Sequence, residues 1–102
     1  MTAEHTYEAF TNSLGSKFQV TVDPDRTVEL KLTEVSERKL YPGQEEFAIT
    51  FKGPGDAFLG QGIRLFNHEV MGSFDLFVVP IRQDAEGFYY EAVFNRFREE
   101  SR

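Results

Sequence analysis

The sequence predicts a mainly β fold, with one short N-terminal helix and about six antiparallel strands arranged as a small barrel or a curled meander sheet. Three observations predict it. Apolar and polar residues alternate with a period of two in several runs. Turn sequences rich in Gly, Pro and Asp separate those runs. A helical spacing of apolar residues occurs near the N-terminus. A barrel would leave no exposed strand edge, but a two-sheet sandwich stays open because periodicity does not reveal pairing.

The size and composition of the chain predict a single β-rich domain over residues 1–102. A chain of 102 residues with 15% aromatic residues is long enough for one core and too aromatic for a disordered protein. The absence of Cys excludes disulfides and thiolate metal sites.

The charge and hydropathy of the chain limit its partners and its location. Seventeen acidic residues outnumber 11 basic ones, and the basic residues are scattered, so nucleic acid is not an expected partner. The longest mainly apolar run, Phe74 to Ile81, is far shorter than the ~20 residues that span a bilayer. Because no classical signal peptide is visible either, we expect a soluble cytoplasmic protein with no membrane insertion.

Residues 6–14 are predicted to form the helix. Tyr7, Phe10 and Leu14 follow one another at spacings of three and four, which places them on one helical face. Thr6 is a suitable N-cap, and Gly15 is suited to end the helix. So short a helix is unstable alone in water, so we expect it to dock on one face or at the mouth of the sheet.

The next three runs are typical of strands with one buried and one solvated face. A turn sequence, Asp23-Pro24-Asp25-Arg26, separates the first run from the second and predicts a hairpin. A polar stretch with Tyr41-Pro42-Gly43 precedes the third run. The alternating apolar residues are Phe18, Val20 and Val22, then Val28, Leu30 and Leu32, and then Phe47, Ile49 and Phe51.

Glycine-bounded loops divide the second half of the chain. Between Gly53-Pro54-Gly55 and Gly60-Gln61-Gly62, residues 57–59 are expected to form an apolar plug. Three further strands are predicted at residues 63–67, 74–81 and 88–94, so that strands occupy residues 17–95. Residues 96–102 are predicted to be a polar tail.

The last two of these strands are apolar on both faces, which predicts burial on both sides. One side would face the core. The helix, the loop at Phe58 and Leu59, or another chain would cover the other. A large exposed apolar patch on a soluble protein usually marks an interface, so we expect a protein partner or a homo-oligomer.

The second half therefore supplies the candidate interface or pocket. Asp75 and Glu91 each stand alone in an apolar strand, and a carboxylate buried there could act as a general acid or base. Arg64 could instead pair with one of them, or each could face solvent. The candidate residues are Phe58, Leu59, Arg64, Asp75, Phe77, Val79, Tyr89, Glu91 and Val93.

Known catalytic and metal-binding patterns do not fit the chain. Leu65 stands where a dinucleotide-binding loop needs its third Gly, and Val28 stands where a calcium loop starting at Asp23 needs its Gly. The two His residues, His5 and His68, are too few for a histidine zinc site, and His68 beside a turn suggests a surface position. No Gly follows Ser73 as a nucleophile elbow requires. We therefore expect no catalytic residues, no metal and no cofactor.

Several strings of the chain resemble a small bacterial family known only as a domain of unknown function. They are Gln61-Gly62, Asp75-Leu76-Phe77 with Val79-Pro80, and Tyr90-Glu91-Ala92-Val93-Phe94-Asn95, the most distinctive of the three. The likeness spans nearly the whole chain. It implies no activity, cofactor or catalytic residue. Members resemble small stand-alone proteins, some near phage-tail-like genes, which implies an assembly or accessory role.

Two functions follow as hypotheses. The first is a non-enzymatic binding or assembly module, because apolar strands are present and a catalytic constellation is absent. The second is a small-ligand-binding barrel, or an enzyme that uses Asp75 or Glu91 in an apolar pocket.

Overall fold

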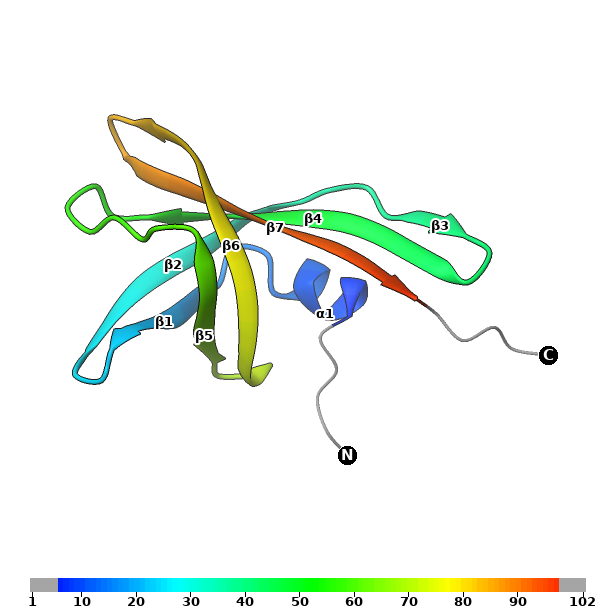
Figure 1. Ribbon diagram of the computed structural model, residues 1–102, viewed down its shortest axis with the longest axis horizontal. Helices are drawn as coiled ribbons and strands as arrows, with labels where there is room; N and C mark the ends of the chain where they lie inside the picture. Colours follow the sequence, from blue (N-terminus) through cyan, green and yellow to red (C-terminus); the bar gives the residue numbers. More distant parts are fainter. Residues whose placement is uncertain (1–5, 98–102) are drawn as a thin grey trace.

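One seven-stranded antiparallel sheet makes up most of the computed structural model, which describes residues 6–97 (Figure 1). The predicted mainly β fold with one short helix is confirmed. The predicted polar tail lies largely outside the described residues. The elements are α1 (Tyr7–Asn12), β1 (Lys17–Asp23), β2 (Arg26–Val35), β3 (Lys39–Tyr41), β4 (Gln44–Gly53), β5 (Gly62–His68), β6 (Gly72–Asp84) and β7 (Gly87–Phe97).

Six of the strands close into a barrel, which decides between the barrel and the sandwich. The strand order is β2-β1-β5-β6-β7-β4-β3, and an additional pairing of β2 with β4 closes the ring. Val20 lies opposite Phe66 where β1 meets β5, and Leu32 lies opposite Phe51 where β2 meets β4. The seventh strand, β3, was not predicted. It pairs only with β4, through a turn at Pro42-Gly43 in which Gly43 has a φ of 74°.

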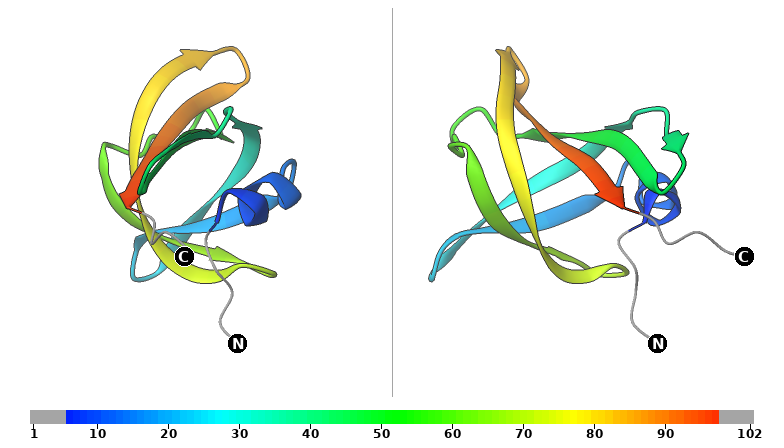
Figure 2. Two further views of the ribbon diagram at one scale, coloured as in Figure 1. Left: turned by 90° about the vertical axis from the view of Figure 1, so that its right-hand side faces the viewer. Right: turned by 45° about the vertical axis from the view of Figure 1, so that its right-hand side comes forward.

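A second region, which we call the wing, extends the molecule beyond the barrel. The wing consists of β3 and the paired segments 44–47 of β4 and 94–97 of β7. Figure 2 shows it projecting to one side, and it contributes to extents of 50 × 29 × 22 Å. An ion-pair cluster ties the wing to α1. Arg38 contacts Glu8 of α1 at 3.0 Å and Glu45 of β4 at 3.2 Å.

Aromatic rings fill the barrel interior. Phe18, Phe51, Phe66 and Tyr90 are all fully buried. The ring centroids of Phe18 and Phe51 are 5.3 Å apart, and those of Phe51 and Phe66 are 5.0 Å apart. These aromatic rings therefore pack against one another across the middle of the barrel.

Helix α1 docks at one end of the barrel, as its length required. The lower part of β6 pairs with β5, whereas the end of β7 pairs with β4, so the two strands diverge there (Figure 1). Phe10 of α1 fills this opening. Its ring centroid lies 5.3 Å from that of Phe94 and 6.0 Å from that of Phe74. The Thr6 side chain accepts a hydrogen bond from Ala9 N at 3.1 Å, so the predicted N-cap is confirmed.

The predicted end of the helix needs a correction. The helix ends at Asn12, and Leu14 is 52% exposed instead of continuing the apolar face of Tyr7 and Phe10. Ser13 caps the helix with a non-helical ψ of 8°, and Gly15, with a φ of 86°, then turns the chain toward β1. Its N–H then donates to Leu32 O at 2.8 Å, which commits the segment to the start of the sheet.

The prediction of burial on both faces is wrong for residues 74–81 and holds only in part for residues 88–94, where Tyr89 and Tyr90 are both buried and Val93 is 62% exposed. Burial alternates along β6 up to Val78, so that Leu76 and Val78 face the interior while Phe77 is 50% exposed. The helix and the glycine-bounded loop cover the ends of the barrel, and neither covers the outer side of β6. Within that loop Leu59 is buried and its N–H donates to Tyr90 Oη at 2.9 Å, and Ala57 is partly buried against the core, whereas Phe58 is 59% exposed.

Candidate functional site

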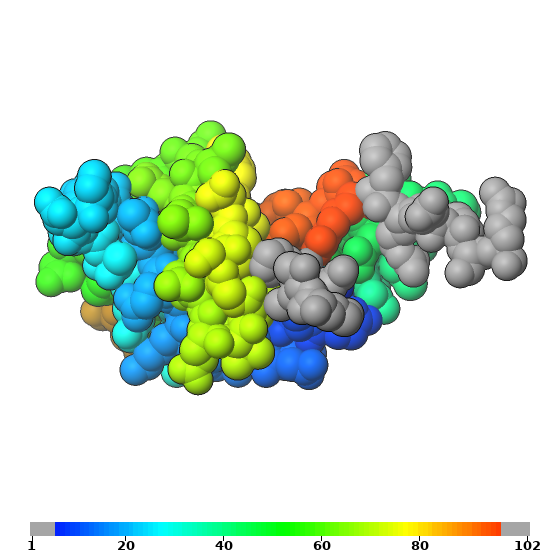
Figure 3. All heavy atoms as spheres, turned by 90° about the horizontal axis from the view of Figure 1, so that it is seen from below, coloured from blue at the N-terminus to red at the C-terminus, as the bar shows by residue number. Residues whose placement is uncertain are grey.

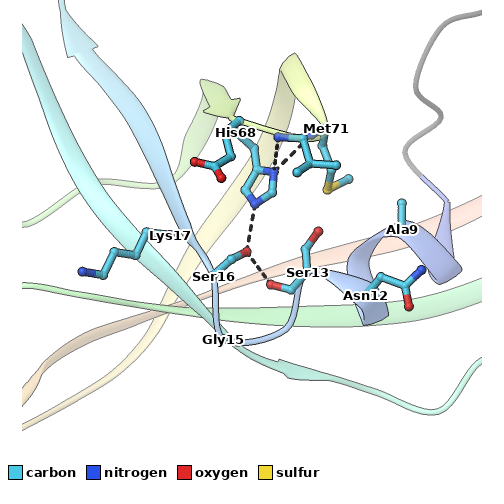
Figure 4. Close-up of a pocket in the computed structure, with 10 residues that line it drawn as sticks. Ala9, Asn12, Ser13, Gly15, Ser16, Lys17, His68 and Met71 are labelled. Atoms are coloured by element: carbon cyan, nitrogen blue, oxygen red, sulfur yellow. Dashed lines mark hydrogen bonds between the residues drawn. The ribbon is translucent and has the colours of Figure 1, made fainter.

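The first candidate is a pocket of about 660 Å³ between α1 and the turn that joins β5 to β6, which we call the α1 pocket. Figure 4 shows the residues that line it. Polar groups come from Ser13, Ser16 and His68, and apolar surface comes from Val70 and Met71. The Lys17 side chain extends away from the imidazole (Figure 4).

The hydrogen bonds of His68 determine what this pocket can do. Its Nδ1 accepts from the backbone N–H groups of Val70 and Met71, both at 3.1 Å. A neutral imidazole that accepts at Nδ1 carries its proton on Nε2, so Nε2 donates to Ser16 Oγ at 2.8 Å. The Ser16 hydroxyl in turn donates to Ser13 O.

The direction of the Ser16–His68 hydrogen bond is the reverse of that in a catalytic serine–histidine pair. A nucleophilic serine donates its proton to an imidazole nitrogen that accepts it. Here Ser16 accepts from His68 and donates to a main-chain carbonyl. The arrangement is therefore a clasp that fastens the β5–β6 turn to the segment between α1 and β1.

Sequence reasoning placed His68 at the surface, yet it is only 7% exposed. The alternation of residues along β5 would have predicted that His68 is buried. His68 follows Phe66 by two residues, and residues two apart in a strand share a face. Because Phe66 belongs to the core, His68 points the same way.

No group of three or more His, Asp, Glu or Cys residues within residues 6–97 could hold a metal ion. Over the same residues, no helix is both long and apolar enough to cross a membrane.

The second candidate is an apolar surface on the outer side of β5 and β6, which we call the β5–β6 face. It consists of Ile63, Leu65, Phe77 and Val79. Ile63 lies directly opposite Phe77, and the other two residues lie two positions along their strands on the same side. Ile63 is 71% exposed, Phe77 50% and Leu65 44%. β5 and β6 run side by side across the surface seen in Figure 3.

Two carboxylates border the β5–β6 face. Asp75 lies opposite Leu65, and Glu91 of β7 lies opposite Val79. Neither carboxylate takes part in any of the ion pairs found among residues 6–97. The outward positions of β5 and of the part of β6 that pairs with β5 carry no Lys or Arg, and Arg82, farther along β6, lies over the Tyr89 ring. The face is therefore apolar with an acidic rim.

The structure brings together only part of the predicted site. Asp75, Phe77 and Val79 are neighbours on β6, and Glu91 lies across from Val79. Sequence reasoning missed Ile63 and Leu65, although they alternate with Phe66 and His68 along β5 in the same way.

Arg64 lies on the opposite side of the strand from this face. It is paired with the buried Leu76, so its side chain starts on the inner face of the barrel. There Nη2 donates to Gly60 O at 2.9 Å, and Nε has no hydrogen-bond partner among the described residues. Of the two alternatives that the sequence left open, the ion pair of Arg64 with Asp75 or Glu91 is therefore not formed.

The other predicted residues lie apart from the β5–β6 face. Phe58 packs against Phe88 with ring centroids 5.0 Å apart, and Leu59 is buried beneath the loop. Tyr89 is buried below the guanidinium of Arg82, which is 3.9 Å from the ring centroid. Val93 is 62% exposed on the part of β7 that pairs with β4, opposite Ala48.

The two carboxylates do not form the buried acid or base that one hypothesis required. Asp75 is exposed, and Glu91 is only partly buried on the outer side of the barrel. The ionisable group that the interior does perturb is Tyr90, because burial raises the pKa of its phenol. That phenol accepts the Leu59 N–H hydrogen bond, so its role is in packing.

A family model described as a domain of unknown function (DUF6916) matches residues 5–94. No curated protein and no solved structure matches the chain.

Proposed function

The chain belongs to the DUF6916 family, a domain of unknown function, and from that premise we propose that it is a non-enzymatic protein-binding or assembly module. Its interface is the β5–β6 face. The observation that carries the proposal is the direct opposition of Ile63 and Phe77, both at least half exposed, on the outside of a closed barrel. Cross-strand apolar pairs in contact with water have a cost that a bound partner removes.

The alternation of the strands supports this interpretation. A barrel needs apolar residues only on its inner face, and β5 and β6 already supply Phe66, Leu76 and Val78 there. Ile63, Leu65 and Phe77 therefore add nothing to the closed interior. Their apolar character is better explained by contact with another molecule.

The chemistry of the polar groups supports a binding role over a catalytic one. The Ser16–His68 pair has the polarity of a structural clasp, and Asp75 and Glu91 lie on the outer side of the barrel. A role as an accessory subunit of a phage-tail-like or other bacterial complex is compatible with a small chain that offers one binding face. The resemblance of its sequence strings to a family with some members near phage-tail-like genes motivates that finer part of the proposal.

Site-specific photocrosslinking in cells that express the chain natively tests the proposal. p-Benzoyl-phenylalanine would replace Phe77 in one variant and Leu40 in the control. Both residues are 50% exposed, and Leu40 lies on the wing. We expect a discrete protein adduct from position 77 and none from position 40. Equal labelling at both positions, or no adduct at position 77, would contradict the proposal.

Small-molecule binding at the α1 pocket is a second candidate, favoured by the pocket's volume of about 660 Å³, which is within the usual range for ligand sites. A fragment screen followed by amide chemical shifts would test it. Shifts confined to residues 9–17 and 68–71 would support this function. Shifts absent from both segments would exclude it.

A further inference from the structure

The β5–β6 face carries a charge pattern as well as an apolar surface. Asp75 and Glu91 border it on β6 and β7, and neither has a cationic partner among residues 6–97. Exposed acids elsewhere, such as Asp25 and Glu34, also lack a cationic partner among these residues. Asp75 and Glu91 differ from them because they border an apolar surface, so a partner that covers this surface would meet their charges.

A second copy of this chain fits the face poorly. In a two-fold dimer the same surface meets itself, so Asp75 and Glu91 of one copy would approach those of the other. Each copy also carries a net charge of −6. Like charges placed together at an interface disfavour association, and the face holds no Lys or Arg to offset them.

We propose that the partner of the β5–β6 face is a protein segment with apolar side chains flanked by Lys or Arg. The apolar side chains would cover Ile63 and Phe77, and the flanking cations would meet Asp75 and Glu91. This inference rests on the proposed function and specifies its partner. Because the rim charges are accessible to water, their contribution is to selectivity and to the rate of encounter, and it weakens as salt is added.

Three short synthetic peptides test the partner chemistry against the full chain. The first alternates leucine and lysine, the second has glutamate for lysine, and the third has serine for leucine. Fluorescence anisotropy would measure their dissociation constants at low and high salt. We expect the leucine–lysine peptide to bind most tightly, and Asp75→Asn with Glu91→Gln to weaken it about ten-fold at low salt.

A matched variant distinguishes the effect of the rim carboxylates on peptide binding from the general attraction of a cationic peptide to an acidic protein. Asp25→Asn with Glu34→Gln removes two exposed carboxylates elsewhere on the molecule, outside any ion pair among the described residues. We expect this control to change affinity less than two-fold. Equal weakening by both double variants would overturn the assignment of the rim.

The remaining outcomes distinguish this inference from the proposed function. Equal binding of the glutamate peptide, or no binding of any peptide, would overturn the cationic partner while a crosslink at position 77 would still support the binding face. A crosslinked adduct at twice the mass of the chain would identify a second copy as the partner. That result would also overturn the cationic partner and still support the binding face. Binding that survives Ile63→Ser with Phe77→Ser would show that the face is not the peptide site, and with no crosslink at position 77 both proposals would fail.

Discussion

Two hairpins in the same barrel, β1–β2 and β5–β6, have similar inner faces and opposite outer faces. Both point buried apolar residues inward, such as Val20 in the first and Val78 in the second. On the outside of β1–β2, Lys17 pairs with Glu29 at 3.5 Å, and Gln19 donates to Glu29 at 3.4 Å. The equivalent outer side of β5–β6 carries the opposed pair Ile63 and Phe77.

The difference separates what builds the barrel from what remains for other purposes. The inner alternation is required in both hairpins, because closure depends on it. The outer residues of β1–β2 satisfy one another and suit a solvated surface. On β5–β6 Ser73 donates to Asn67 at 3.1 Å, but Ile63 and Phe77 expose apolar surface to water, so this hairpin offers a surface that a partner could cover.

The largest effect is expected from a change to the interior that both hairpins share. Phe18 of β1 is fully buried, and its ring centroid lies 5.3 Å from that of Phe51 and 4.3 Å from that of His68. Phe18→Ala should lower the free energy of unfolding by ~3–5 kcal/mol through lost burial and a cavity. Urea denaturation would measure the loss.

The same substitution on the outer side of β6 is the control. Phe77→Ala should change stability by less than about 1 kcal/mol, because half of that side chain already contacts water. A loss as large as that of Phe18→Ala would mean that the β5–β6 face is packed against something within the chain.

A smaller loss is expected where the interior has no room for a methyl group. A Cβ at Gly53 would lie 2.5 Å from Leu30 Cδ2 and 3.3 Å from Tyr90 Cε1. Gly53→Ala should cost ~1–3 kcal/mol, since the leucine must move into an already filled core. At Gly60 the nearest atom would be 3.9 Å away, so Gly60→Ala should leave the melting temperature nearly unchanged. Equal shifts in melting temperature would contradict the tight interior.

The third prediction concerns pH and compares an interior tyrosine with an exposed one. Burial raises the pKa of Tyr90 above its ordinary value of 10.0. The unfolded chain therefore ionises first, so the stabilisation is complete below about pH 10 and is lost as the pH rises through the raised pKa. Denaturation from pH 8 to 11 should show a steeper fall for the unsubstituted chain than for Tyr90→Phe. Tyr41→Phe, which alters a residue 48% exposed on the wing, is the matched control for the loss of a tyrosine hydroxyl.

The smallest effect on stability is expected when the outer face of β5–β6 is made to resemble that of β1–β2. Ile63→Lys with Phe77→Glu places an opposite-charge pair across the two strands. Exposed pairs contribute little, so the free energy of unfolding should change by less than about 1 kcal/mol. Peptide binding and the crosslink should nevertheless disappear, with a residue other than 63 or 77 carrying the crosslinker. A loss above about 2 kcal/mol would assign these side chains to folding instead.

Alternation along the chain was sufficient to predict most of the fold. Phe18, Val20 and Val22, and the later runs, predicted the strands because a half-buried strand shows its period over a few residues. The strand β3 has only three residues, all exposed, and therefore no period to detect. Barrel closure depends on contacts such as Val20 with Phe66, which join residues far apart in sequence and leave no local pattern.

The candidate site was only partly predictable, for a different reason. Apolar residues on both sides of β6 were interpreted as burial on both sides, but a residue type reports what a position favours, not whether the structure covers it. Exposed Phe77 and buried Val78 are therefore indistinguishable in the sequence. Strand parity would have separated Arg64 from Asp75, because their partners Leu76 and Leu65 lie on opposite faces.

The seam between β1 and β5 has a consequence for the dynamics of the barrel. Only three residue pairs join these strands, Gln19 with Asn67, Val20 with Phe66 and Thr21 with Leu65, fewer than at any other junction of the ring. Amide hydrogen exchange at this junction should report an opening of lower free energy than global unfolding. Leu65 belongs both to the seam and to the β5–β6 face. A bound partner would therefore slow amide exchange there and stabilise the barrel against opening at this junction.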